Sequence, residues 1–188
     1  MFRESAIALV LALAAAAAGA QGLYIGGAGG ATRSNADCAG TLSCDNSDTG
    51  WKAYAGYQIN PSVSVEVLGY DYGGTRGVVP LPGIGAVNAS LKTSGFGVAG
   101  VIQVPLGYTV DLLGRVGLGS NRLKVSASSG ALSGSDSESD AQLLWGVGLA
   151  FKLSPNLALR TEIDGTSATY AGERFDSMLY SIGLSVRF

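Results

Sequence analysis

The sequence predicts an all-β fold, an eight-stranded antiparallel up-and-down transmembrane β-barrel. Three observations indicate it. Apolar residues recur at every second position in successive segments, and the connections between these segments alternate between short and long. The chain is 47% hydrophobic and only 14% charged, whereas a soluble domain carries about 25% charged residues. After residue 20 there is no run of eighteen apolar residues, so a transmembrane helix is excluded, while a barrel spreads its apolar residues over alternate positions.

Residues 1–20 are predicted to be a signal peptide, and residues 21–188 the barrel domain. Arg3 gives a positive start, weakened by Glu4, and an apolar run over 6–18 precedes the small residues Ala18-Gly19-Ala20 of a cleavage site. A membrane-anchoring helix is the alternative, less favoured because the run is shorter than the ~20 residues that span a bilayer. Export together with two-faced strands predicts the bacterial outer membrane.

Eight strands are expected, and all but the glycine-rich first one have a well-defined apolar face. They cover residues 23–32, 51–58, 62–72, 88–103, 108–123, 140–153, 157–168 and 178–188. Because lipid surrounds a membrane barrel, we expect the apolar faces to point outward. In the second to seventh strands these faces consist of Trp51, Ala53, Ala55 and Tyr57; Val63, Val65 and Val67; Leu91, Thr93, Gly95, Ala99 and Val101; Val110, Leu112, Val116 and Leu118; Leu143, Trp145, Val147, Leu149 and Phe151; and Leu157, Leu159, Thr161 and Ile163.

The last strand has the clearest alternation in the chain. Its apolar face runs from Met178 to a final aromatic residue, and the other face is mixed, with Leu179 followed by small or polar residues. We interpret this strand as the signal for insertion into the outer membrane, carried by Tyr180, Ile182, Leu184, Val186 and Phe188.

The connections support the same topology. Short turns are expected at 60–61, 104–107 and 154–156, and long loops at 33–50, 73–87, 124–139 and 169–175. Outer-membrane barrels have short periplasmic turns and long exterior loops. An even number of strands then places both ends of the chain in the periplasm.

Charged residues alternate with the apolar faces, which places them inside the predicted barrel. The expected interior charges are Lys52, Glu66, Lys92, Asp111, Arg115, Arg160, Glu162 and Asp164. An eight-stranded barrel has room only for side chains, and a lone buried charge is very costly, so we expect a paired network with Glu66 and Arg115 near its middle. Two interpretations stay open, a polar plug that fills the barrel, which is favoured, and a gated or narrow ion path.

Both cysteines, Cys38 and Cys44, lie in the first long loop. Export to an oxidising compartment favours a disulfide between them. A metal-binding pair is the weaker alternative because the chain contains no histidine. The following run 45–48 has oxygen ligands but lacks the glycine and distal glutamate of an EF-hand loop. No metal or cofactor is therefore expected.

Three local features resemble the OmpA-like and OmpX-type outer-membrane barrels. They are the segment 50–61 followed by Val65-Glu66, the run Arg115-Val116-Gly117-Leu118-Gly119, and the strand from Tyr180 to Phe188. The resemblance covers residues 22–188. It implies a structural and interaction protein that supports the outer membrane and displays surface loops, sometimes for adhesion. The peptidoglycan-binding domain of full OmpA proteins would follow Phe188, so a cell-wall tether is not carried over.

Other functions are less favoured. A small passive pore is the main alternative. Enzymatic activity is not expected, because the absence of histidine excludes His-based triads, and the outer-membrane barrel enzymes that the chain resembles in architecture use histidine. The formal charge of −2, without a basic patch, argues against nucleic-acid binding.

We expect a monomer whose partners are outer-membrane lipid, lipopolysaccharide, the insertion machinery and an unidentified surface partner. The second long loop is the favoured contact site, because residues 78–84 form an apolar run at an exterior position. The Ser/Gly-rich third loop, 126–139, is a weaker candidate, and the alternative for both is that they merely cap the barrel.

Overall fold

The predicted fold class is confirmed by a computed structural model, which describes residues 22–35, 43–81, 85–129, 132–170 and 173–188. The strands of these ranges are β1 Leu23–Ser34, β2 Ser43–Asp45, β3 Ser47–Asn60, β4 Val63–Leu81, β5 Gly85–Pro105, β6 Val110–Ser129, β7 Leu132–Lys152, β8 Leu157–Tyr170 and β9 Glu173–Arg187. No helix in the described ranges is long and apolar enough to cross a membrane. The expected signal peptide lies outside the described residues and stays a prediction.

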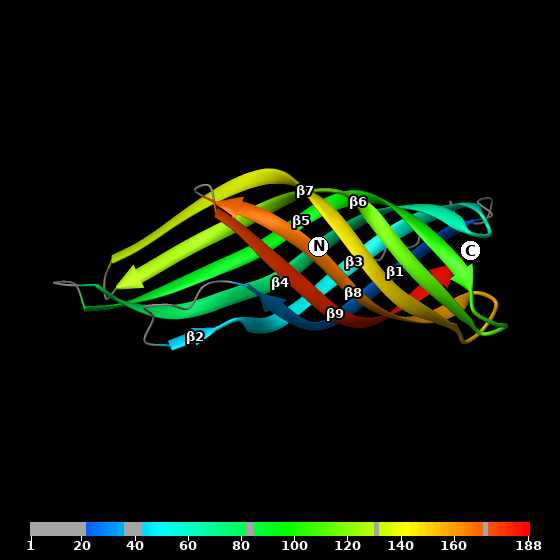
Figure 1. Cartoon of the computed structure of the whole chain (residues 1–188), viewed down its shortest axis with the longest axis horizontal. Helices are drawn as coiled ribbons and strands as arrows, with labels where there is room; N and C mark the ends of the chain where they lie inside the picture. Colours follow the sequence, from blue (N-terminus) through cyan, green and yellow to red (C-terminus); the bar gives the residue numbers. More distant parts are fainter. Residues whose placement is uncertain (1–21, 36–42, 82–84, 130–131, 171–172) are drawn as a thin grey trace, which may run out of the picture.

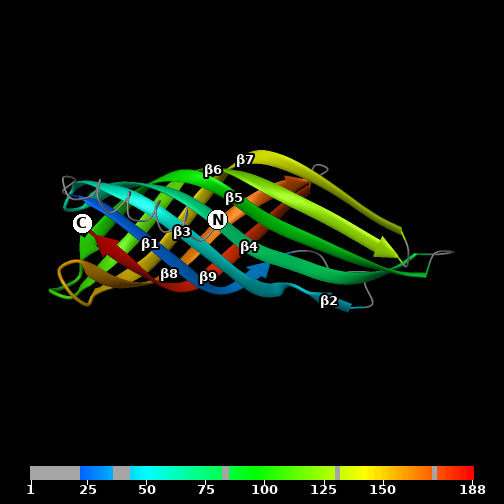
Figure 2. The ribbon, with the colours of Figure 1, turned by 180° about the vertical axis from the view of Figure 1, so that it is seen from behind.

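Eight long strands close into a ring in which every pairing is antiparallel. The order is β1-β3-β4-β5-β6-β7-β8-β9, and β9 returns to β1. The tilted strands wrap around one long axis, with the C-terminus at the same end as the β5–β6 and β7–β8 turns (Figures 1 and 2). The short strand β2 is an addition at the other end, where it pairs with the outer part of β4.

The distribution of side chains is the reverse of that in a soluble protein, as expected for a membrane barrel. Among the described residues, 27 large hydrophobic residues are exposed, whereas Glu66 is completely buried. On β5 the outward apolar residues run from Phe96 to Val104. These nine positions cover about 30 Å along the strand, or about 23 Å along the membrane normal at a tilt of ~40°, which matches the apolar band of ≈ 25 Å in outer-membrane barrels.

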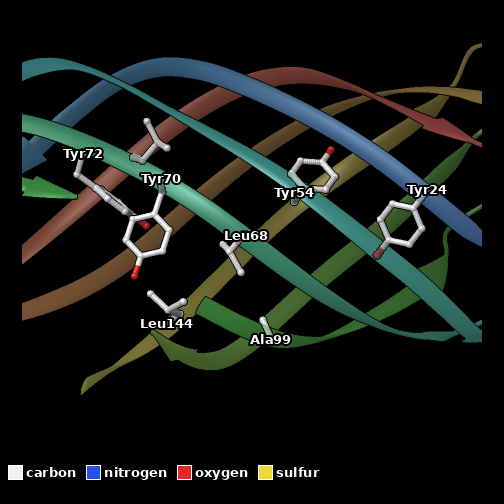
Figure 3. Close-up of a cluster of buried hydrophobic side chains, with 8 residues drawn as sticks. Tyr24, Tyr54, Leu68, Tyr70, Tyr72, Ala99 and Leu144 are labelled. Atoms are coloured by element: carbon white, nitrogen blue, oxygen red, sulfur yellow. The ribbon is translucent and has the colours of Figure 1, made fainter. Parts of the chain in front are cut away.

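Tyrosines fill the narrow interior (Figure 3). Tyr24 stands directly opposite Gly56, and Tyr54 directly opposite Gly26, on the neighbouring strands β1 and β3. A Cβ atom on either glycine would lie 2.3 Å from the ring of the facing tyrosine. Each glycine therefore makes room for one aromatic ring, and the two rings meet edge to face at 6.4 Å between centroids.

The prediction for the faces of β5 was wrong. The interior contains Thr93, Ala99 and Val101, whereas Phe96 and Val98 of the opposite face are exposed. Both faces of this strand carry apolar residues, so alternation alone did not decide between them. The side chains of the smaller face fit a lumen already filled with tyrosines, and the larger ones remove more apolar area from water when they contact lipid.

The second and third long loops were also predicted wrongly, because they are largely continuations of the strands. The β4–β5 ladder extends outward to the pair Leu81 and Gly85, and the β6–β7 ladder to Ser129 and Leu132. Ser/Gly-rich composition favours a loop, but backbone hydrogen bonds between strands that are already paired do not depend on the side chains. Two long hairpins therefore project from the exterior end.

A β-bulge marks the point where β4 leaves the membrane. The β4–β5 register shifts between Asp71 and Gly74. Gly73 adopts a φ of 64°, in the left-handed region that glycine enters without strain, and its N–H donates to Asp71 Oδ1 at 2.7 Å. Inward positions are even-numbered before the bulge, as at Tyr70, and odd-numbered after it, as at Thr75, so a constant period of two fails here.

We predict that deleting Phe188 lowers the amount of protein inserted in the outer membrane. The Phe188 N–H donates to the Leu23 carbonyl at 3.0 Å where β9 meets β1, and its side chain completes the outward face of β9. Fractionation and heat-dependent gel migration, which distinguishes folded from unfolded barrel, measure the effect. Tyr108→Ser removes another exposed aromatic residue at the same end and is the control. Equal amounts of the two variants in the outer membrane would refute the role of Phe188 in insertion.

Candidate functional site

The centre of the barrel interior holds a network of ion pairs around Glu66. Its Oε2 lies 2.7 Å from an Arg115 terminal nitrogen, and its Oε1 lies 2.9 Å from an Arg160 terminal nitrogen. The three residues belong to β4, β6 and β8, so the contacts cross the lumen. The Glu66 side chain is fully buried, and both arginine side chains are at most 5% exposed.

Two further carboxylates extend the network along β8. Glu162 Oε1 lies 3.1 Å from Arg115 and 2.9 Å from Arg160, and its Oε2 lies 2.8 Å from Lys52 Nζ. Asp164 accepts hydrogen bonds from both Lys52 and Arg115. Arg115 therefore contacts three carboxylates, and Glu162 contacts three cations.

The network is electrically neutral. Three cations, Lys52, Arg115 and Arg160, face three carboxylates, and all six side chains are at most 5% exposed. Burial of unpaired ions costs several kcal/mol each, and good geometry with additional hydrogen bonds offsets that penalty. Neutrality is thus the condition under which these groups can fill a membrane-embedded lumen.

Tyr24 and Tyr54 complete the network from the β1–β3 side. The Tyr24 hydroxyl donates to Glu66 Oε1 at 2.9 Å and contacts Ser64 Oγ at 2.8 Å. The Arg160 guanidinium lies 4.5 Å from the centroid of the Tyr54 ring, within the range of a cation–π interaction. The aromatic rings therefore stabilise charged groups as well as filling space.

Glycines of β7 leave room for the carboxylates of β8. Gly146 is paired with Asp164 and Gly148 with Glu162. A Cβ atom on Gly146 would lie 2.6 Å from Asp164 Oδ1, and one on Gly148 would lie 2.3 Å from the backbone carbonyl oxygen of Thr161. Even an alanine at position 148 would force the strands apart.

A second, smaller group of polar residues lies toward the short-turn end. Asp111 Oδ1 accepts a hydrogen bond at 2.8 Å from Lys152 Nζ, and its Oδ2 accepts one from Gln103. Both Asp111 and Lys152 line a mouth with about 100 Å³ of space for water, which reaches inward to Tyr24 and Arg160. Water from the periplasm can thus approach one side of the central network.

A third polar layer closes the barrel toward the exterior. The Tyr70 hydroxyl donates to Asn121 Oδ1 at 2.5 Å, and Asn121 Nδ2 donates to Thr166 Oγ1 at 2.8 Å. Asn121 is 1% exposed, and the interior side chains Leu123 and Leu179 are at most 2% exposed. The cavity beyond them, lined in part by Leu123, has only about 20 Å³ of space for water.

The structure brings together five of the six residues expected in the main charge network, namely Lys52, Glu66, Arg115, Arg160 and Glu162. Asp164 joins them, and Asp111 lies in the separate group at the mouth. Lys92 was predicted wrongly: it is exposed on the outer face, because the inward and outward faces of β5 were interchanged in the sequence interpretation.

Sequence reasoning missed Tyr24, Tyr54 and Asn121. The alternation of β3 placed Tyr54 on the inward face, but no signal linked it to Arg160. Tyr24 lies in the glycine-rich first strand, whose faces the sequence left undefined. In both 24–26 and 54–56 a tyrosine is followed two residues later by a glycine. This repeated spacing is the sequence signal that could have indicated the reciprocal packing of the two rings.

The expected pair Cys38 and Cys44 is only partly described. Cys44 lies in β2, where it pairs with Gly77 of β4, and Cys38 lies outside the described residues. The disulfide therefore stays a prediction. The five residues of the expected insertion signal, Tyr180 to Phe188, are all on the exposed face of β9, and their role stays a prediction as well.

We predict that removing either Glu66 or Arg115 destabilises the barrel by about 3–5 kcal/mol, the usual effect of breaking a buried pair. Glu66→Gln leaves one excess positive charge and Arg115→Met one excess negative charge. The double variant keeps two cations and two carboxylates, so its loss should be smaller than the sum of the singles.

Urea unfolding of the barrel in lipid vesicles, followed by tryptophan fluorescence, measures these free energies. Arg115→Met combined with Lys152→Met is the control, because Lys152 pairs with Asp111 outside the central network, and this double should be additive. Additivity in the Glu66 and Arg115 double would mean that the two charges do not interact.

Comparisons with known proteins agree with this architecture. The family model of the outer membrane protein beta-barrel domain matches residues 5–188. No curated protein matches the chain in sequence. Among solved structures, Neisserial surface protein A is 19% identical, with a TM-score of 0.63, and the match covers 90% of this chain and 99% of that one.

Two further barrels are similar in structure. The attachment invasion locus protein Ail of Yersinia pestis, in complex with the heparin analogue sucrose octasulfate, is 20% identical, with a TM-score of 0.57 and coverage of 89% and 99%. OprG of Pseudomonas aeruginosa is 16% identical, with a TM-score of 0.57 and coverage of 90% and 97%. These likenesses show the fold. The chain belongs to the outer membrane protein β-barrel family and resides in the bacterial outer membrane.

Proposed function

We propose that this protein is a closed structural barrel that reinforces the outer membrane and presents its exterior hairpins to a surface partner, without enzymatic activity. The observation that carries this proposal is the contrast between the two parts of the molecule. The lumen is filled by a neutral ion network, and the β4–β5 and β6–β7 hairpins extend far beyond the apolar band.

The filled lumen supports a polar plug rather than an ion path. Glu66 is paired to two arginines across the lumen, so an ion that passed would have to break these contacts. On the exterior side, Asn121 and Leu123 are almost completely buried. An ion would therefore have to displace two successive layers of packed side chains.

The length of the hairpins supports a role in contact. β5 contains 21 residues, of which the nine from Phe96 to Val104 form the apolar band. The part from Gly85 to Gly95 adds about 36 Å along the strand, or about 28 Å along the membrane normal at a tilt of ~40°. Binding residues commonly lie in segments that a rigid scaffold holds in place.

Adhesion is the contact function that we favour. Ail is an attachment invasion locus protein, and one of its structures contains a heparin analogue. Its barrel is similar to this one over nearly the whole of both chains, although the low identity does not carry over its binding residues.

We predict that the wild-type barrel shows no discrete conductance steps in a planar lipid bilayer. The ion network and the layer of Asn121 and Leu123 fill the described lumen, so replacement of Glu66, Arg115, Asn121 and Leu123 by serine should open a water path. This variant is the positive control, provided that its heat-dependent gel migration shows a folded barrel. Stable conductance steps from the wild-type protein would support the passive pore instead.

We predict that shortening the β4–β5 hairpin abolishes adhesion while the barrel still inserts. Residues 76–90 would be replaced by Asn-Gly, a two-residue turn that joins the directly paired Thr75 and Leu91. The matched control replaces 126–135 in the β6–β7 hairpin, between the paired Val125 and Asp136, and should retain adhesion. Attachment of expressing cells to host-cell and matrix surfaces is measured. Unchanged attachment in the first variant would contradict the contact role.

A further inference from the structure

Lys92 and Lys124 form a pair of like charges on the outside of the barrel. They are directly opposite each other in the β5–β6 register, and both are exposed. The outward orientation follows from the alternation on each strand: their neighbours Thr93 and Leu123 are buried in the interior. Neither lysine has an ion-pair partner among the described residues.

Such a pair is unfavourable unless an anion is present. Directly opposite like charges on neighbouring strands destabilise a sheet. The chain has more acidic than basic residues, 14 against 12, so the cation pair does not reflect a generally basic composition. Arg122, also exposed, pairs with Ser94, two residues from Lys92, and adds a third cation. The nearest described acid on this face is Asp71, paired with Ser94 on the other side.

The position of the lysines defines the kind of anion. The apolar band of β5 ends at Phe96 and that of β6 at Leu118, so Lys92 and Lys124 lie four and six residues further outward. At 3.3 Å per residue and a tilt of ~40°, this places their Cα atoms about 10–15 Å above the band. Lysine side chains can bend back toward the membrane surface by several ångströms, so the ammonium groups reach the headgroup zone of the outer leaflet.

We propose that Lys92 and Lys124 form a binding site for the phosphate groups of an outer-leaflet lipid, of which lipopolysaccharide is the abundant representative. The side chains point away from the barrel axis at the level of the headgroup zone, not from the hairpin tips, so a lipid headgroup is favoured over a soluble polyanion. An anion bridging both ammonium groups would also remove their repulsion. The site uses the membrane location of the barrel and does not depend on a hairpin partner.

The test is a titration of the detergent-folded barrel with bisphosphorylated lipid A, with bound lipid counted by native mass spectrometry. Lys92→Gln combined with Lys124→Gln should raise the dissociation constant about 30-fold. Each lysine near an anionic lipid surface contributes a factor of about five. Lys92→Arg with Lys124→Arg should retain binding. Dephosphorylated lipid A should bind to the wild type as weakly as lipid A binds to the double glutamine variant.

Arg33→Gln is the matched control. Arg33 is exposed on β1, where its register partners are Ser47 and Met178 instead of a second cation, so its removal should change the dissociation constant by less than about twofold. Heat-dependent gel migration verifies that every variant is folded. The proposal is overturned if the double glutamine variant binds like the wild type, if Arg33→Gln weakens binding equally, or if a soluble sulfated oligosaccharide binds these lysines more tightly than lipid A does.

Discussion

The pairing of Glu66 with Arg115 and Arg160 constrains the strands that carry them. Because the period of a strand is two, a slip of one residue would turn Glu66 toward lipid and bring Val65 into the lumen. A similar slip of β6 or β8 would expose an arginine to hydrocarbon, at a cost of about 2–4 kcal/mol near the bilayer midplane. The ion network therefore favours one register on β4, β6 and β8, and the outward valines and leucines favour the same one.

The interior architecture follows from this constraint. Long charged side chains from β3, β6 and β8 can meet at the axis only if other positions stay small. Gly146 and Gly148 fulfil this condition beside the carboxylates of β8, while Tyr24 and Tyr54 close the side of the lumen that the charges leave open. The glycine content that would weaken a soluble sheet is here a requirement of packing.

Alternation in the sequence was sufficient for the fold and for most of the charge network, because in most strands only one face could tolerate lipid. Glu66 stands between Val65 and Val67 of the outward face, so its orientation had one solution. β5 had two: its faces differ in size rather than in polarity, and Lys92 was therefore assigned to the wrong side. The bulge at Gly73 and the extended hairpins depend on backbone conformation and strand pairing, which alternation does not report.

The ion network in the lumen and the outer pair of Lys92 and Lys124 differ in how their charges are neutralised. The first serves stability, and the second serves recognition. Inside, three cations are neutralised by three carboxylates of the same chain, so nothing external is needed. Outside, Lys92 and Lys124 face each other across two strands, and their neutralisation requires a group from the surroundings. The internal network can thus remain intact while the outer face and the hairpins vary, because the contacts of the network among the described residues lie within the lumen. A rigid, self-neutral barrel with an externally neutralised rim is suited to hold exposed hairpins at a fixed height above the membrane.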